Sequence, residues 1–297
     1  MKTLQTASLV IASFILPAIS IAQGAAPALN TQQIEQLTGA KGQYNEKEGT
    51  FKVSVPRSDL KMTTAGVRMT PPLGLTSWAT FMRAGSQAMV MGDMVVLEGQ
   101  VNPVMSAALD NGLQVTALHN HFLWASPQVM FMHIGGMGDE AKLAGAMGKV
   151  FATIKSPAPA GSEPSTSIDP AKTSLDPKKI EAVLAYPGEL KDGVYKVTIG
   201  RTTKMHGHTV GNTMGVNTWA AFAGSDQEAI VDGDFAMLES ELQDVLKALR
   251  GSGINIVAIH NHMTDEQPRI MFLHYWGVGR TTDLAQGLKA ALSVTRH

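Results

Sequence analysis

Two short stretches of the chain carry histidines at nearly the same spacing. The later stretch reads IHNHMTDEQPRIMFLHYWG and contributes His260, His262 and His274. Side chains two residues apart in a β-strand point to the same face, so both histidines of a His-x-His pair can bind the same ligand. If the intervening loop closes an antiparallel hairpin about Glu266, residue 272 lies opposite His260 and His274 lies one diagonal step away. The pattern predicts three imidazoles that converge on one point.

Three converging imidazoles are typical of a metal site. They leave one coordination position open, as in a catalytic zinc site rather than a closed structural one. The chain has no cysteine, so a transition metal must use histidine and oxygen ligands. We therefore predict a divalent-metal cofactor, with zinc ahead of nickel, copper or manganese. The competing interpretation is that the histidines are hydrogen-bonded core residues.

The earlier stretch, LHNHFLWASPQVMFMHIGG, repeats the pattern with His119, His121 and His133. A constant offset of 141 residues relates them to the later histidines, and it also aligns TSWATFMRAGSQAMVMGDMVVLE with NTWAAFAGSDQEAIVDGDFAMLE. The match runs without gaps over about sixty residues, which chance does not produce. The chain therefore contains two copies of one repeat, produced by an internal duplication.

The two copies differ in their polar residues. The second copy contains MHGH, a further His-x-His formed by His206 and His208, where the first copy has TTAG. These two histidines are expected to complete or flank the metal site. The second copy also has Asp265, Glu266 and Arg269 where the first has tryptophan, alanine and glutamine. We expect the second copy to be the working site and the first a weaker one, with metal binding there left open.

Carboxylates near the histidines are candidates for acid-base chemistry. Glu239 or Glu266 is the expected general base for a metal-bound water, and Arg269 is expected to orient an anionic substrate. Glu239 closes an apolar strand, so it can also be a ligand, a hydrogen-bond partner of a ligating imidazole, or a solvated strand-end residue. Asp93 and Asp234 each follow a glycine, a pairing that predicts a bulge or turn.

Each copy reads as runs of strands interrupted by helices. This order favours the α+β class, with a mostly antiparallel sheet and two or three helices in each domain, and two like domains about a pseudo-twofold. Asn102, before a proline, predicts the start of a helix, and Asn111, before a glycine, predicts its end. Trp78 and Trp219 are expected to anchor the two cores.

The N-terminus, MKTLQTASLVIASFILPAISIAQG, has the form of a signal peptide over residues 1–22, cleaved near Ala22. This predicts a periplasmic or secreted protein with no stable membrane span after cleavage. The repeat domains are expected at 31–155 and 178–297, and the Pro/Ser-rich segment 156–177 is expected to link them. The oligomeric state is left open.

The charge balance indicates which kind of partner the chain can bind. With 24 basic and 25 acidic residues and no basic cluster, the chain lacks the surface that nucleic-acid binding requires. The expected partner is a small-molecule substrate or a metal ion.

The long stretch from MHGHTVGNTMGVNTWAAFAGSDQEAIVDGDFAMLE to IHNHMTDEQPRIMFLHYWGVG resembles the family defined by the domain of unknown function DUF1259, which includes the mycobacterial lipoproteins LppY and LpqO. The resemblance covers both repeats and implies two tandem copies of that domain. Unlike the lipoprotein members, this chain has no lipobox cysteine. A more distant likeness is to a small ester-hydrolase family whose zinc is held by His-x-His and a third histidine about ten residues on.

These observations support three hypotheses of function. The first is a periplasmic divalent-metal protein with an open three-histidine site that hydrolyses an ester-like substrate. The second is a non-catalytic periplasmic carrier or sensor of copper, nickel or zinc, suggested by the paired His-x-His motifs and the methionines. The third is a scaffold or ligand-binding protein in which the histidines are structural.

Overall fold

The computed structural model describes residues 28–157 and 165–296, and the expected signal peptide lies outside them. The first repeat comprises, in order, α1 (Thr31–Thr38), β1 (Gly42–Asn45), β2 (Thr50–Pro56), β3 (Thr63–Thr64), β4 (Val67–Arg68), a 3-10 turn (Pro71–Leu73), β5 (Thr76–Ala84), β6 (Gln87–Leu97), α2 (Glu98–Asp110), β7 (Gln114–His119), β8 (Ala125–Ser126), β9 (Val129–Gly138) and α3 (Glu140–Lys155).

The second repeat follows the same order after a 3-10 turn, Pro170–Lys172. It comprises α4 (Pro177–Leu184), β10 (Gly188–Lys191), β11 (Val194–Gly200), β12 (Thr203–Met205), β13 (His208–Val210), a 3-10 turn (Asn212–Met214), β14 (Asn217–Gly224), β15 (Ala229–Leu238), a 3-10 turn (Glu239–Glu241), α5 (Leu242–Gly251), β16 (Asn255–His260), β17 (Glu266–Gln267), β18 (Ile270–Gly279) and α6 (Thr281–Ser293).

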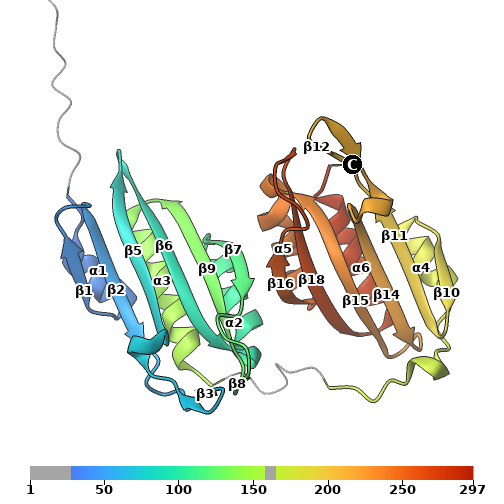
Figure 1. The fold of residues 1–297 in the computed structure, drawn as a ribbon, viewed down its shortest axis with the longest axis horizontal. Helices are drawn as coiled ribbons and strands as arrows, with labels where there is room; N and C mark the ends of the chain where they lie inside the picture. Colours follow the sequence, from blue (N-terminus) through green and yellow to red (C-terminus); the bar gives the residue numbers. More distant parts are fainter. Residues whose placement is uncertain (1–27, 158–164, 297) are drawn as a thin grey trace, which may run out of the picture.

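The two repeats share one antiparallel sheet. Its twelve strands run in the order β1-β2-β5-β6-β9-β7-β16-β18-β15-β14-β11-β10, so equivalent strands lie at equal distances from the centre (Figure 1). At the centre β7 pairs with β16 through Leu118 and Ile259, which are equivalent residues of the two copies. The α+β class and the pseudo-twofold arrangement are therefore confirmed, and the pseudo-twofold passes between these two strands.

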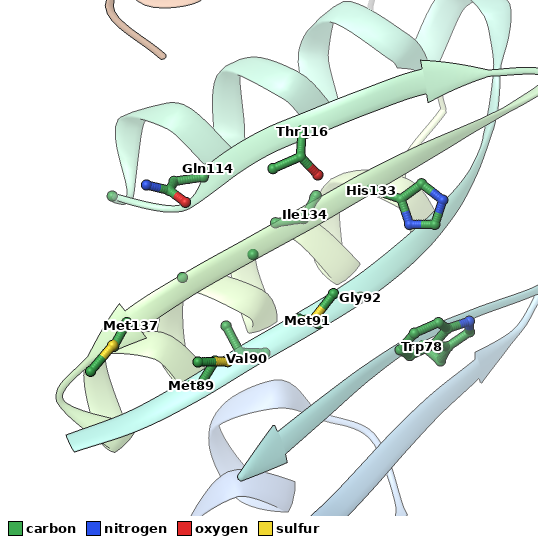
Figure 2. Close-up of a pocket in the computed structure, with 13 residues that line it drawn as sticks. Trp78, Met89, Val90, Met91, Gly92, Gln114, Thr116, His133, Ile134 and Met137 are labelled. Atoms are coloured by element: carbon green, nitrogen blue, oxygen red, sulfur yellow. The ribbon is translucent and has the colours of Figure 1, made fainter. Parts of the chain in front are cut away.

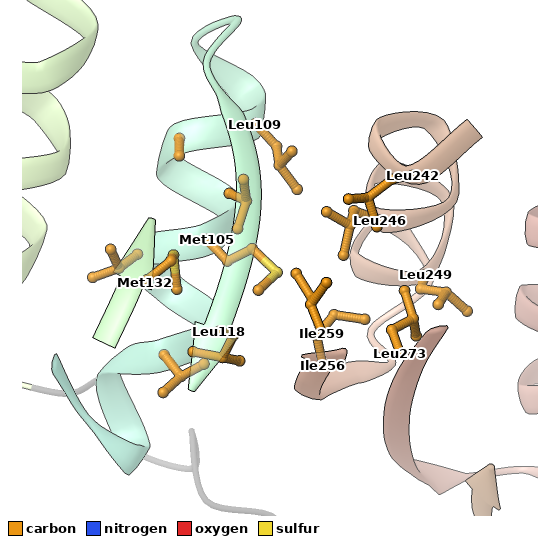
Figure 3. Close-up of a cluster of buried hydrophobic side chains, with 14 of the residues drawn as sticks. Met105, Leu109, Leu118, Met132, Leu242, Leu246, Leu249, Ile256, Ile259 and Leu273 are labelled. Carbon is orange, nitrogen blue, oxygen red and sulfur yellow. The ribbon is translucent and has the colours of Figure 1, made fainter. Parts of the chain in front are cut away.

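The helices cover one face of the sheet, with α3 and α6 behind the strands in Figure 1. Strand residues facing them alternate with exposed ones, as in β2, where every second side chain is buried. At the junction α2 packs against α5, and a single apolar cluster spans both repeats. Figure 3 shows it, with Met105, Leu109 and Leu118 facing Leu246 and Ile259.

Two amide side chains join the repeats across this junction. Asn102 accepts a hydrogen bond from Ile256 N at 2.8 Å and donates to Ile256 O at 3.3 Å. Its equivalent, Gln243, makes the same two bonds with Val115. The expectation that Asn102 starts a helix is wrong, because α2 begins at Glu98 and leaves the Asn102 side chain free to reach the partner repeat.

The other face of the sheet is partly covered. Two three-stranded sheets, β4-β3-β8 and β13-β12-β17, lie over one end of each repeat and enclose small apolar clusters. Segment 165–176 runs along the second repeat, where Ser174 N and Leu175 N both donate to Gly224 O. None of the helices within residues 28–157 and 165–296 has the length and apolar character needed to span a membrane.

Candidate metal centre

Three neighbouring strands of the second repeat bring the predicted histidines together. Phe272 of β18 pairs with His260 of β16, and His274 pairs with Ala258, which confirms the hairpin register expected from the sequence. On the other side of β18, His274 pairs with Asp234 of β15. Cross-strand partners share a face, so these side chains project together from the sheet face that the helices leave open.

The ligand atoms of this cluster lie close to one another. His262 Nε2 is 3.0 Å from Asp234 Oδ2 and 3.2 Å from His260 Nε2. His260 Nε2 is 3.8 Å from Asp234 Oδ2. Ligand atoms of Asp234, His260 and His274 all lie within 4.8 Å of one another, so this group can hold a metal ion. With His262, the cluster offers three imidazoles and one carboxylate.

Hydrogen bonds fix which nitrogen two of the three rings present. His262 Nδ1 lies 3.0 Å from Gly215 O and His274 Nδ1 lies 3.2 Å from Gly233 O. Donation from each Nδ1–H to a backbone carbonyl leaves Nε2 with a free lone pair, the arrangement found in metal-ligating histidines. The His262 ring also stacks on Phe272 with 3.5 Å between centroids, which holds its orientation.

The carboxylate of Asp234 is the most informative member of the cluster. Its side chain is 4 % exposed, and within the described residues its Oδ1 atom is buried without a hydrogen-bond partner. His260 Nδ1 is likewise buried and unpartnered. Buried polar atoms without protein partners are rare, and a bound ion is one of the groups that can satisfy them.

Burial also affects the protonation of His260. Desolvation lowers the pKa of His260, against the opposing effect of Asp234, and the neighbouring His274 and His262 lower this pKa further. A lowered pKa favours neutral imidazole near neutral pH, and neutral imidazole is the form that binds metals.

The expectation that Asp93 and Asp234 serve a bulge or turn is wrong. Both lie inside long strands, β6 and β15, directly opposite His133 and His274. The register shifts lie instead in β7, between Val115 and Ala117, and in β16, between Ile256 and Ala258. The glycine before Asp234 serves packing, because a Cβ on Gly233 would lie 2.1 Å from the hydroxyl of the buried Tyr275. The signal available in the sequence was a Gly-Asp pair inside an apolar run, at the same position of both copies.

His206 and His208 lie in a different structure from the other histidines. They flank Gly207 in the β12–β13 hairpin, where Met205 pairs with His208 and the two turn residues have φ of 51° and 82°. Positive φ at both positions marks a two-residue turn of type I′, so the two histidines do not share a strand face. Both are exposed, and within the described residues no hydrogen bond or ring contact joins them to the cluster.

The predicted acid-base residues also lie apart from the histidines. Glu239 is exposed at the start of a 3-10 turn, and Arg269 is exposed in the loop before β18. Glu266 is buried in β17, where its Oε1 accepts a hydrogen bond from Ile270 N at 3.2 Å. Among the described contacts, none joins these three side chains to Asp234 or the imidazoles. The carboxylate that contacts the histidines is Asp234.

The first repeat holds an equivalent but looser cluster. The ring of His119 lies 5.1 Å from those of His121 and His133, and His121 stacks on Phe131 at 3.4 Å. Asp93 is buried with Oδ1 unpartnered, as in the second repeat. Desolvation lowers the pKa of His121, with Asp93 opposing. In the described part of this repeat, however, no three ligand atoms come within 4.8 Å of one another.

A groove of about 440 Å³ adjoins the first cluster (Figure 2). Its lining includes Trp78, His133 and Gly135. In the second repeat, the residue equivalent to Gly135 is Trp276. The groove is open in the first repeat because glycine leaves this position empty.

The prediction that Trp78 and Trp219 anchor the two cores is wrong, since both are half-buried on the open face. Lys52 Nζ lies 4.5 Å from the Trp78 ring centroid, and Lys196 Nζ lies 4.2 Å from that of Trp219.

Comparison with known proteins identifies the repeat. The model of a protein family described as Domain of Unknown Function (DUF1259) matches twice, over residues 32–153 and 178–294. Among curated proteins and solved structures, none matches the chain. The resemblance noted in the sequence is thus confirmed, and the chain belongs to the DUF1259 family, with two tandem copies of its domain.

Proposed function

We propose that this chain is a periplasmic or secreted metal-binding protein whose second repeat holds one divalent transition-metal ion. The ligands are His260, His262 and His274, with Asp234 as the fourth. The observation that carries the proposal is the buried Asp234 carboxylate, in contact with two imidazoles and with one oxygen unpartnered in the described structure. A cation bound among the imidazoles through Asp234 Oδ2 would neutralise this buried carboxylate and explain why four polar side chains converge on a sheet face.

The donor set indicates which metals fit. Three imidazole nitrogens and one carboxylate oxygen, without sulfur, suit zinc and also admit nickel, copper or manganese. Zinc heads this order because four such ligands match its preferred tetrahedral coordination. The second repeat is favoured over the first because ligand atoms of Asp234, His260 and His274 already lie within 4.8 Å of one another.

Hydrolysis is a second candidate function, supported by the exposure of the site. The side chains of His260 and His262 are 29 % and 31 % exposed, so solvent and a substrate can reach them. A metal-bound water is a nucleophile near neutral pH, and zinc sites accept a fifth ligand. In this second role Asp234 would not bind the metal but would accept a proton from a water held by the ion that the three imidazoles bind, in place of Glu239 or Glu266. An ester-like substrate is the expected class.

Metal analysis of the full chain, purified without a histidine tag, tests the binding proposal. We expect about one zinc per chain after loading and dialysis, lost in a His260→Ala/His262→Ala variant. The matched control is His119→Ala/His121→Ala, which changes the equivalent residues of the first repeat and should keep the metal. Retention of metal in the first variant, or its loss only in the second, would contradict the proposal.

Activity is tested separately. A panel of ester substrates is incubated with the zinc-loaded chain and with the His262→Ala variant. Turnover that disappears in the variant supports hydrolysis. Absence of turnover together with a readily exchangeable metal would favour a carrier or sensor and reject the hydrolytic role.

A further inference from the structure

A group of methionines lies on the open sheet face of the first repeat, apart from the histidine clusters. Met82 is on β5, Met89 and Met91 are on β6, and Met137 is on β9. Met82, Met91 and Met137 are 41 %, 60 % and 58 % exposed, which is unusual for large apolar side chains. Figure 2 shows Met89 and Met137 at one end of the groove and His133 with Trp78 at the other.

Strand pairing places three of these thioethers in one row. Met89 pairs with Met82 on one side and with Met137 on the other. Neighbouring strands lie about 4.8 Å apart, and the Cβ atoms of direct partners about 5 Å apart. Methionine has three rotatable bonds, so sulfurs from Met82 and Met137 can both reach a point above Met89. Met91, two residues along β6 on the same face, lies beside them.

The fold itself does not require methionine at these positions. The second repeat builds the same strands with residues that carry no sulfur, and the equivalents of the four methionines are Ala223, Ile230, Asp232 and Val278. A packing role would favour burial, yet three of the four side chains are exposed. The shared property of the group is therefore its chemistry, which is a set of uncharged, polarisable sulfur ligands on one surface.

We propose that the first repeat binds a soft monovalent metal ion, Cu(I), through Met82, Met89 and Met137, with Met91 flanking the site. Thioether sulfur selects Cu(I) over the divalent ions that prefer nitrogen and oxygen. The chain has no cysteine, so no thiolate within it competes for the ion. This site is distinct from the histidine centre of the second repeat and does not depend on that centre binding metal.

The test is an anaerobic competition for Cu(I) between the full chain, purified without a histidine tag, and a chromophoric Cu(I) chelator. We expect the chain to withdraw about one Cu(I), and a Met89→Leu/Met137→Leu variant to bind at least ten-fold more weakly. Methionine-to-leucine exchanges nearly conserve volume, so the sheet should remain folded. The control is Met214→Leu, because Met214 is 62 % exposed and is the only methionine among the exposed large apolar side chains in the described part of the second repeat.

A second measurement detects metal binding at individual methionine side chains in the chain without substitutions. With methionine methyl groups labelled with carbon-13, silver(I), a redox-inert analogue of Cu(I), should shift the NMR signals of Met82, Met89 and Met137 and leave Met214 unchanged. The proposal is overturned if the chain does not compete for Cu(I), or if the methionine variant binds as well as the parent. It is also overturned if Cu(I) binding disappears only when His119 and His121, or His260 and His262, are replaced by alanine.

Discussion

Replacing Gly233 with alanine is expected to damage the core and the metal centre together. A Cβ at this position would lie 2.1 Å from Oη and 2.2 Å from Cζ of Tyr275, and 2.4 Å from Trp219 O. The Tyr275 ring is fully buried, and its hydroxyl donates to Trp219 O at 2.8 Å. The ring must therefore move, and this hydrogen bond must lengthen or break.

The expected cost follows from those contacts. Overpacking costs about 1–3 kcal/mol, and loss of a buried hydrogen bond adds about 1 kcal/mol, so the free energy of unfolding should fall by roughly 2–4 kcal/mol. The equivalent change, Gly92→Ala, is the matched control. Its Cβ would lie 2.6 Å from Trp78 O and 3.0 Å from Met94 Cε, the flexible end of a side chain. Without a buried ring to displace, it should cost about 1–2 kcal/mol.

Urea denaturation of the metal-free parent and both variants measures this difference. Zinc titration of the same proteins measures the effect on the site, because Gly233 O orients His274 and the next residue is Asp234. Gly233→Ala should weaken zinc binding about 10–100-fold, as loss of supporting contacts around metal ligands typically does. The reasoning is refuted if Gly233→Ala is no more destabilising than Gly92→Ala, or if it leaves zinc affinity unchanged.

Two further predictions concern buried polar contacts. Burial acts to raise the pKa of Glu241, but hydrogen bonds from Arg201 at 2.9 Å and from the backbone N–H groups of Arg296 and Leu238 hold this pKa below its usual value. Their stabilising effect is present above about pH 4.5 and is lost as pH falls through the lowered pKa. Glu241→Gln should therefore lower the free energy of unfolding, measured with urea, by about 1.5–3 kcal/mol at pH 7 and by clearly less at pH 3. An equal loss at both pH values would refute this prediction. Asn102→Ala leaves Ile256 N and O without their partner in the other repeat. The free energy of unfolding should therefore fall by about 1–3 kcal/mol, and hydrogen exchange of the Ile256 amide should accelerate. Unchanged exchange of this amide would contradict the contact between the two repeats.

Local patterns in the sequence predicted much of the site. The period-2 spacing placed His260 and His262 on one face, and loop symmetry about Glu266 gave the register that puts Phe272 opposite His260. The duplication, read from the constant offset, predicted equivalent clusters in both repeats. The His-x-His spacing and the hairpin register depend on residues close in sequence, where strand geometry alone fixes the outcome.

Features that depend on long-range pairing were missed. Asp234 joins the cluster only because β15 pairs with β18, and a Gly-Asp dipeptide in isolation suggests turn chemistry. The sheet is continuous only because Leu118 meets Ile259, a contact between two buried apolar residues that carry no distinctive sequence signal. His206 and His208 have the same spacing as His-x-His in a strand, but Gly207 between them favours positive φ and makes the segment a turn.

X-ray absorption spectroscopy of the zinc-loaded chain tests the central claim most directly, because it measures metal–ligand distances, separates sulfur from nitrogen and oxygen ligands, and counts imidazoles by the scattering of their ring atoms. The ligand set of His260, His262, His274 and Asp234 predicts three imidazole nitrogens and one oxygen at about 2.0–2.2 Å, with no sulfur. In Asp234→Asn the three imidazoles should remain, with weaker zinc affinity. Fewer than three imidazoles in the parent, or zinc bound through sulfur, would contradict the assignment of this cluster as a metal centre.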